Sequence, residues 1–226
     1  MSVTINPSAQ SITNHNVLIG GANNLVTNIV PGVAGTVLTS NGVSSNCSFQ
    51  AQGSGTGTFV LLETQTVGAP VASLDFVTGI SGTYANYALT MNNVRNATNT
   101  ALLCLRTSSD GGATYNTTGY TGRQINVQND FSGSIHDQSF TNKFVFTDPL
   151  GSGQPGVSGN CFLYGLTSGS TTSLSGQFSF INSSIQACIG IVAGGYSTNL
   201  NVDALRLFFS SGNISAGTVS LYGIVE

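Results

Sequence analysis

The stretch Tyr84-Ala-Asn-Tyr-Ala-Leu-Thr-Met-Asn-Asn-Val94 decides the fold, because apolar and polar residues alternate along it through Tyr87, Leu89 and Met91. Alternation with a period of two residues indicates a β-strand with one buried face and one face towards water. The next segment, Ala101–Thr107, is a nearly continuous apolar run that also has the length and composition of a strand.

Similar short segments extend this pattern in both directions along the chain. They predict strands at Phe59–Thr66, Ala72–Val77, Gly119–Gln128, Gly159–Leu166, Leu174–Ile181, Gln186–Ala193, Asp203–Phe209 and Gly217–Val225. Glycine-rich turns separate them, and no segment keeps the 3.6-residue apolar period of a helix beyond a turn or two. Residues 59–226 are therefore predicted to form an all-β domain, an antiparallel β sandwich of jelly-roll type. The least regular part, at about residues 129–157, is predicted to be a long surface excursion.

Residues 1–58 have a different composition and are predicted to form an extended N-terminal arm. They are rich in Gly, Asn, Ser and Thr, and contain short β-like pieces at Asn16–Gly20 and Gly35–Thr39. Pieces of this length bury no core alone and need partners from the rest of the fold or from other subunits. Residues 51–58 read as a joint before the β domain.

Charge is scarce along the whole chain. Charged residues make up 6% of the sequence, and none occurs before Glu63; a typical soluble domain has about a quarter. With five Lys and Arg in total, no counterion-release term would drive nucleic-acid binding. No apolar run approaches the roughly twenty residues of a membrane-spanning helix. We therefore expect neither a nucleic-acid partner nor membrane insertion.

The polar surface is predicted to consist of neutral Ser, Thr, Asn and Gln side chains, which suits a protein that works outside cells. The first residues, Met1-Ser-Val-Thr-Ile5, lack the basic and apolar regions of a secretory signal peptide. A location in a virion, or outside the cell or on its surface after release by lysis, fits both features.

The four cysteines, Cys47, Cys104, Cys161 and Cys188, are far apart and have no nearby histidine. This spacing excludes the common metal-ligand patterns, and we expect no metal and no cofactor. Cys104 and Cys188 lie in apolar strand-like runs, where a buried free thiol is the expected state. Disulfide bonds remain an open alternative.

The sharpest local motif is Ser108-Ser-Asp-Gly-Gly-Ala-Thr-Tyr115, which has the Asp-box pattern Ser-x-Asp-x-Gly-x-Thr-aromatic. Its carboxylate and hydroxyl groups are suited to hydrogen-bond turn amides, and its glycines to adopt positive φ. We interpret it as a structural hairpin.

Catalytic patterns are weak. Asp130 with Asp137 or Asp148 would form a carboxylate pair only if the long loop brought them together. His136-Asp137 would suggest an oriented base, but no nucleophile motif accompanies it. We therefore expect no enzymatic activity.

Candidate ligand-binding side chains gather in the loop-rich middle of the chain. They are Tyr115, Tyr120, Arg123, Phe131 and His136. Aromatic rings of this kind stack on sugars, although packing in the core and under the Asp-box turn is the competing interpretation.

Two stretches resemble bacteriophage and prophage tail-fibre proteins. Gly35-Thr-Val-Leu-Thr-Ser-Asn-Gly-Val-Ser-Ser-Asn-Cys-Ser-Phe-Gln50 resembles a "G-x-V-L-T-S-N-G…P-x-F-Q" segment of these proteins, with Cys47 where a proline is usual. Leu74–Ile80, Tyr87–Val94, Leu105–Tyr115 and Ala204–Ile224 form an ordered series similar to a C-terminal β domain of tail and fibre proteins. The resemblance concerns the fold, and it implies no catalytic residue.

These observations favour a structural subunit of an extracellular or virion fibre. The arm would mediate homo-oligomerisation, and the β domain would form a knob that binds a host-surface or glycan receptor. A homotrimer and an open polymer assembled by strand addition are alternative architectures. A glycan-degrading depolymerase is a further alternative.

Overall fold

The computed structural model describes residues 16–20, 26–42, 45–51, 59–129, 141–169, 171–197 and 200–225. Over these residues the regular elements are β-strands, and every strand pair is antiparallel. The chain divides into two compact units, residues 1–55 and 56–226; the predicted division is after residue 58.

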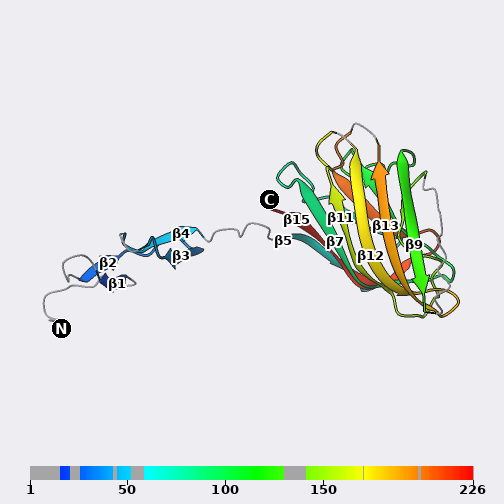
Figure 1. Cartoon of the computed structure of the whole chain (residues 1–226), viewed down its shortest axis with the longest axis horizontal. Coiled ribbons are helices and arrows are strands. Elements are labelled where there is room, and N and C mark those ends of the chain that lie inside the picture. The colour runs from blue at the N-terminus through cyan, green and yellow to red at the C-terminus, as the bar shows by residue number, and fades with distance from the viewer. Residues whose placement is uncertain are drawn as a thin grey trace. The chain divides into compact units, whose positions relative to one another are not determined.

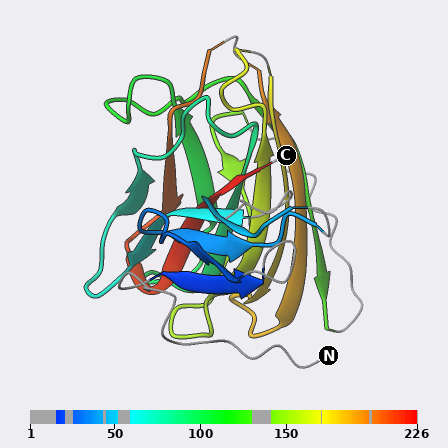
Figure 2. The same ribbon diagram turned by 90° about the vertical axis from the view of Figure 1, so that its left-hand side faces the viewer.

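The larger unit is a two-layer β sandwich, which confirms the predicted all-β class. Its seven-stranded sheet has the order β5 (Phe59–Thr66), β15 (Ile214–Ile224), β7 (Asn86–Asn96), β11 (Val157–Tyr164), β12 (Thr172–Ile181), β13 (Ala187–Tyr196), β9 (Tyr120–Gln128). Its four-stranded sheet has the order β10 (Phe144–Val145), β8 (Leu103–Ser108), β14 (Ala204–Phe209), β6 (Ser73–Phe76). Figure 1 shows the seven-stranded sheet with its strands side by side, and Figure 2 shows the second layer beside it.

Alternation places one side of each sheet in the core. Tyr87 and Leu89 on β7 are fully buried, as are Phe76 on β6 and Leu205 on β14. These side chains form one continuous apolar cluster between the sheets. Burial of large apolar side chains at ~25 cal/mol per Å² is the main term that holds the two layers together.

The smaller unit consists of two antiparallel hairpins. One pairs β1 (Val17–Gly20) with β2 (Val26–Ile29), and the other pairs β3 (Thr36–Thr39) with β4 (Ser48–Ala51). β1 and β3 coincide with the two β-like pieces expected from the sequence, whereas β2 and β4 were not predicted. The predicted joint lies, apart from residue 51, outside the described residues.

The prediction of a surface excursion at about residues 129–157 is wrong for its second half. Phe144, Phe146 and Leu150 are buried, and residues 144–145 form strand β10 at the edge of the four-stranded sheet. The Phe146 N–H donates to the Leu103 carbonyl at 2.8 Å, so this segment extends the pairing of β8. A strand of two residues is too short to show an alternation of apolar and polar residues, so no strand was predicted here. Residues 130–140 lie outside the described part of the chain.

The thiols are free, as predicted for Cys104 and Cys188. Cys104, Cys161 and Cys188 are buried, and Cys47 is partly exposed. Burial raises the pKa of both Cys104 and Cys161 to about 12. These thiols therefore stay protonated and behave as small apolar groups.

Candidate binding site on the outer face of the large sheet

Tyr120 belongs to the core, so it is not a ligand-stacking residue. Its hydroxyl accepts a hydrogen bond from the Thr107 N–H at 2.9 Å, lies 3.0 Å from the Thr107 hydroxyl and donates to the Asn116 carbonyl at 3.2 Å. Its ring packs edge-on against the Phe144 ring, with the ring centroids 5.0 Å apart. Because Thr107 belongs to β8 and Tyr120 to β9, this side chain ties the two sheets together.

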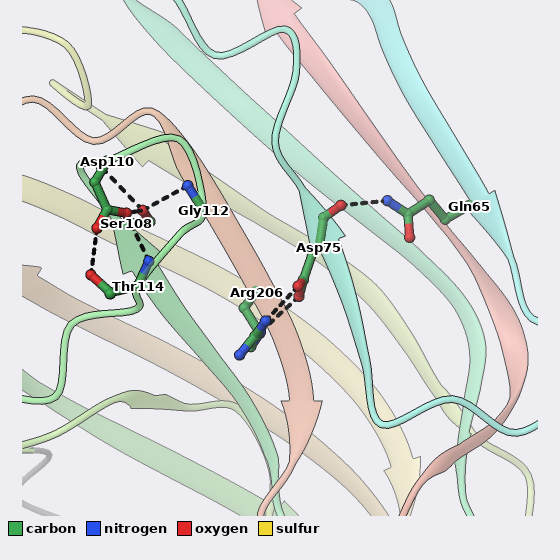
Figure 3. A network of polar contacts seen from close by, with 7 residues as sticks. All are labelled: Gln65, Asp75, Ser108, Asp110, Gly112, Thr114 and Arg206. Atoms are coloured by element: carbon green, nitrogen blue, oxygen red, sulfur yellow. Dashed lines mark hydrogen bonds and ion pairs between the residues drawn. The ribbon is translucent and has the colours of Figure 1, made fainter.

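Tyr115 lies on the outer face of the four-stranded sheet, where its ring packs against the guanidinium of Arg206. The Arg206 guanidinium carbon is 3.9 Å from the centroid of the Tyr115 ring. Arg206 also forms a two-point ion pair with Asp75, drawn in Figure 3. One face of the Tyr115 ring is therefore already occupied by a cation, which is a favourable structural contact.

The Asp-box residues hold a turn through hydrogen bonds, as predicted. Asp110 accepts from the Ser108 hydroxyl at 2.7 Å and from the Thr114 N–H at 2.9 Å (Figure 3). Hydrogen bonds to the carboxylate lower the pKa of Asp110 to about 2, and those from Thr114 contribute more than the one from Ser108. Gly111 and Gly112 both have positive φ. The predicted hairpin is wrong, however, because the turn connects β8 in one sheet to β9 in the other.

The remaining predicted site residues do not join Tyr115. Arg123 is exposed on β9 opposite Ala193 in the seven-stranded sheet, whereas Tyr115 lies against the four-stranded sheet. Phe131 and His136 are outside the described residues. The sequence-predicted cluster is thus divided, over its described members, between the two faces of the sandwich and its core.

The described acids that lie in the sandwich serve structural contacts. Asp148 is buried and accepts a hydrogen bond from the Asn126 side chain at 2.6 Å. Asp203 accepts from the Gly111 N–H at 3.0 Å, and Glu63 from the Gln65 side chain at 2.7 Å. Asp130 and Asp137, the possible partners of Asp148 in a carboxylate pair, are outside the described residues.

The outer face of the seven-stranded sheet is a broad surface of neutral polar groups. Alternation turns small hydroxyl and amide side chains outward on β15, β7, β11 and β12, as the burial patterns show. The rows of this surface contain Thr64, Thr66, Thr90, Asn160, Ser173, Ser175, Gln177, Ser179, Thr218 and Ser220. Direct cross-strand contacts such as Thr64–Ser220, at 2.8 Å between hydroxyl oxygens, order this surface.

An aromatic cluster interrupts the polar surface near the β5 edge. The rings of Phe162 and Tyr164 on β11 are stacked, with their centroids 6.4 Å apart. The ring centroid of Phe59 on β5 lies 6.3 Å from that of Phe162 and 6.1 Å from that of Tyr222 on β15. Phe59 and Tyr164 are exposed. Leu61, next to Tyr222 in the ladder, is exposed as well.

Exposed rings beside neutral hydroxyl and amide groups have the chemistry of a glycan-binding surface. The ring faces pack against the C–H faces of a sugar, and the hydroxyl groups exchange hydrogen bonds with it. Its members come from three strands that are distant in the chain, so no local pattern predicted this cluster. The sequence carries one part of the signal, because Phe162 and Tyr164 alternate with Cys161 and Leu163 and so share a face. The burial of Cys161 and Leu163 in the structure makes that face the outward one.

The described residues contain no group of three or more His, Cys, Asp or Glu side chains that could hold a metal ion. Within the same residues, no helix is long and apolar enough to cross a membrane. Comparison with known protein families, curated proteins and solved structures finds no match to this chain.

Proposed function

We propose that this protein is a structural subunit of an extracellular or virion fibre of the tail-fibre kind. Its N-terminal unit joins copies of the chain, and its β sandwich presents a surface that binds a neutral glycan on a host. The resemblance of residues 35–50 and of the C-terminal series to tail-fibre proteins supports this proposal.

The observation that carries the proposal is the exposure of apolar side chains in the N-terminal unit. Val30 and Val33 are more than 70% exposed, and Val37 and Leu38 are also exposed. Two-stranded hairpins are marginally stable alone, and this region has no charged residue to keep it apart from other surfaces. Contact with another copy would remove these side chains from water and satisfy the hairpin edges.

The assembly proposal is tested by the mass of the particle. The full chain is expected to form particles of several subunits, and residues 56–226, which contain the core cluster, are expected to be a folded monomer. Negative-stain imaging combined with light scattering separates monomer, trimer and filament. A truncated chain that assembles to the full-length mass would contradict the proposal.

The aromatic cluster supports the receptor-binding part of the proposal. Binding of the full chain to an array of neutral and acidic glycans should show neutral glycans as ligands. Tyr164→Ala should weaken binding roughly tenfold, because one stacked ring contributes ~1–2 kcal/mol. Val77→Ala, an exposed change directly after β6 and away from the cluster, is the matched control. Equal loss in both variants would contradict this assignment.

A further inference from the structure

Three of the chain's five Lys and Arg residues lie in one row across the four-stranded sheet. Arg106 on β8 is the register partner of Arg206 on β14, and Arg206 is the partner of Asp75 on β6. The register of β10 against β8 places Lys143, the residue before β10, beside Arg106. The residues on either side of each arginine are buried, so both arginines point to the outer face of this sheet. We call Lys143, Arg106 and Arg206 the basic row.

The basic row carries more positive charge than its neighbours balance. Two arginines directly opposite each other are unfavourable in a sheet, because like charges repel. Asp75 balances Arg206 through the two-point ion pair drawn in Figure 3. No carboxylate among the described residues forms an ion pair with Arg106 or Lys143. An unfavourable local arrangement that the fold itself does not compensate is typical of a functional surface.

The guanidinium of Arg106 is held in a fixed position. Its Nε donates to the Asn142 carbonyl at 3.1 Å, and its central carbon lies 5.1 Å from the centroid of the Phe208 ring. Within the described part of the chain, its terminal Nη groups have no hydrogen-bond partner. Burial raises the pKa of the Cys104 thiol, and the charges of Lys143 and Arg106 lower it against that effect, so both cations lie near this side chain. A positioned planar guanidinium beside an ammonium suits a carboxylate, which accepts two parallel hydrogen bonds.

We propose that the basic row binds the carboxylate groups of an acidic polysaccharide, and that Arg106 and Lys143 contact them. The ion pair between Arg206 and Asp75 shows the geometry that a ligand carboxylate would adopt on Arg106. Neighbouring strands are ~4.8 Å apart, so the row is about 10 Å long and offers contacts to more than one acidic group. This site lies on the other sheet from the aromatic cluster and takes a charged ligand, so it goes beyond the proposed function.

Two other kinds of polyanion fit the row less well. Single-stranded nucleic acid is bound largely by stacking of its bases on aromatic rings, whereas the two rings beside the row, Phe208 and Tyr115, already contact its arginines. Anionic membrane surfaces are bound by clusters of about four to eight Lys and Arg, and this row has three. A saccharide also needs neutral hydrogen-bonding partners, which the exposed Thr141 and Asn142 supply beside the row.

The test measures binding of the full chain to an oligogalacturonide, which carries a carboxylate on each sugar, and to its uncharged methyl ester. Isothermal titration calorimetry is expected to show binding of the acid form that weakens as salt is added, because salt screens surface charges. The methyl ester is expected to bind more weakly than the acid form. Arg106→Gln and Lys143→Gln are each expected to weaken binding of the acid form roughly fivefold.

Arg95→Gln is the matched control for these two variants. Arg95 is also partly exposed and donates a hydrogen bond through its Nε, but it lies on β7 in the seven-stranded sheet. Removing this charge is expected to leave binding of the oligogalacturonide unchanged. Far-UV circular dichroism and thermal unfolding establish that all three variants are folded. Equal weakening in all three would overturn the proposal, since total charge and not the basic row would then determine binding.

The remaining outcomes concern the ligand and the face that it binds. Absence of binding to the oligogalacturonide, or equally tight binding of its methyl ester, would overturn the proposal. Tighter binding of single-stranded DNA, or of vesicles that contain phosphatidylserine, would overturn it too, because the row would then serve another polyanion. Tyr164→Ala should leave binding of the oligogalacturonide unchanged; weakening would place this ligand on the aromatic cluster. If no neutral glycan binds but the oligogalacturonide does, the receptor part of the proposed function is wrong and the basic row stands.

Discussion

Arg206 on β14 and Asp75 on β6 form a two-point ion pair between adjacent strands. The Arg206 Nε–Asp75 Oδ1 distance is 2.8 Å, and the Nη2–Oδ2 distance is 2.6 Å. The two residues are register partners in the four-stranded sheet. In a chain with so few charges, this pair couples the edge strand β6 to its neighbour and holds the guanidinium over Tyr115.

The ion pair makes part of the stability dependent on pH. Burial raises the pKa of Asp75, but the hydrogen bonds from Arg206 and Ser73 and the Arg206 charge outweigh it, so the pKa lies below 3.8. A folded-state pKa below the unfolded value stabilises the fold above about pH 4, and this contribution is lost as pH falls through the folded pKa. Asp75→Asn should therefore cost up to ~1 kcal/mol near neutral pH, because the pair is partly exposed. Urea unfolding at several pH values should show this difference shrinking below pH 4; a difference that grows in acid would contradict it.

The Asp-box turn should tolerate alanine at one glycine and not at the next. Gly112 has φ +84°, and an added Cβ would lie 2.6 Å from Val77 Cγ1. Gly111 has φ +70°, but a Cβ there meets open space. We expect Gly112→Ala to cost ~2–3 kcal/mol and Gly111→Ala about 1 kcal/mol, measured as the change in the free energy of unfolding in urea. Equal costs would mean that the backbone conformation alone, and not the contact with Val77, limits this position.

The Tyr120 hydroxyl should be a measurable link between the two sheets. Tyr120→Phe leaves the buried Thr107 N–H without its 2.9 Å acceptor, which costs ~1–3 kcal/mol. Tyr164→Phe removes a hydroxyl from an exposed ring and should change stability by less than ~0.5 kcal/mol. Thermal and urea unfolding of both variants measure the difference. Similar values for the two would show that the hydrogen bond from Thr107 contributes nothing to the fold.

Thiol labelling should separate one cysteine from three. Cys47 is partly exposed, whereas Cys104, Cys161 and Cys188 are buried, and a buried protonated thiol reacts slowly. A disulfide reagent such as DTNB should therefore modify one thiol per native chain, and four after denaturation. Cys47→Ser should abolish the fast reaction. Rapid modification of more than one thiol in the native chain would contradict the buried placement.

Local patterns in the sequence were sufficient to place most strands of the sandwich. The alternation at Tyr84–Val94 identified β7 because a strand exposes every second side chain to the same environment, and this signal lies within one segment. It failed at β10, where Phe144 and Val145 form too short a strand for any period to appear. The burial of Cys104 and Cys188 was equally local, since both lie in apolar runs.

The face that each side chain occupies was decided only by tertiary structure. A period of two says that Phe162 and Tyr164 share a face, but it does not say whether that face is the core or the solvent. Likewise, Tyr115 and Tyr120 are five residues apart, yet one lies outside the four-stranded sheet and the other in the core. Strand pairing is a contact between distant segments, so no local pattern predicts which sheet a strand joins. The aromatic cluster, which brings together side chains of β5, β11 and β15, depends on that pairing.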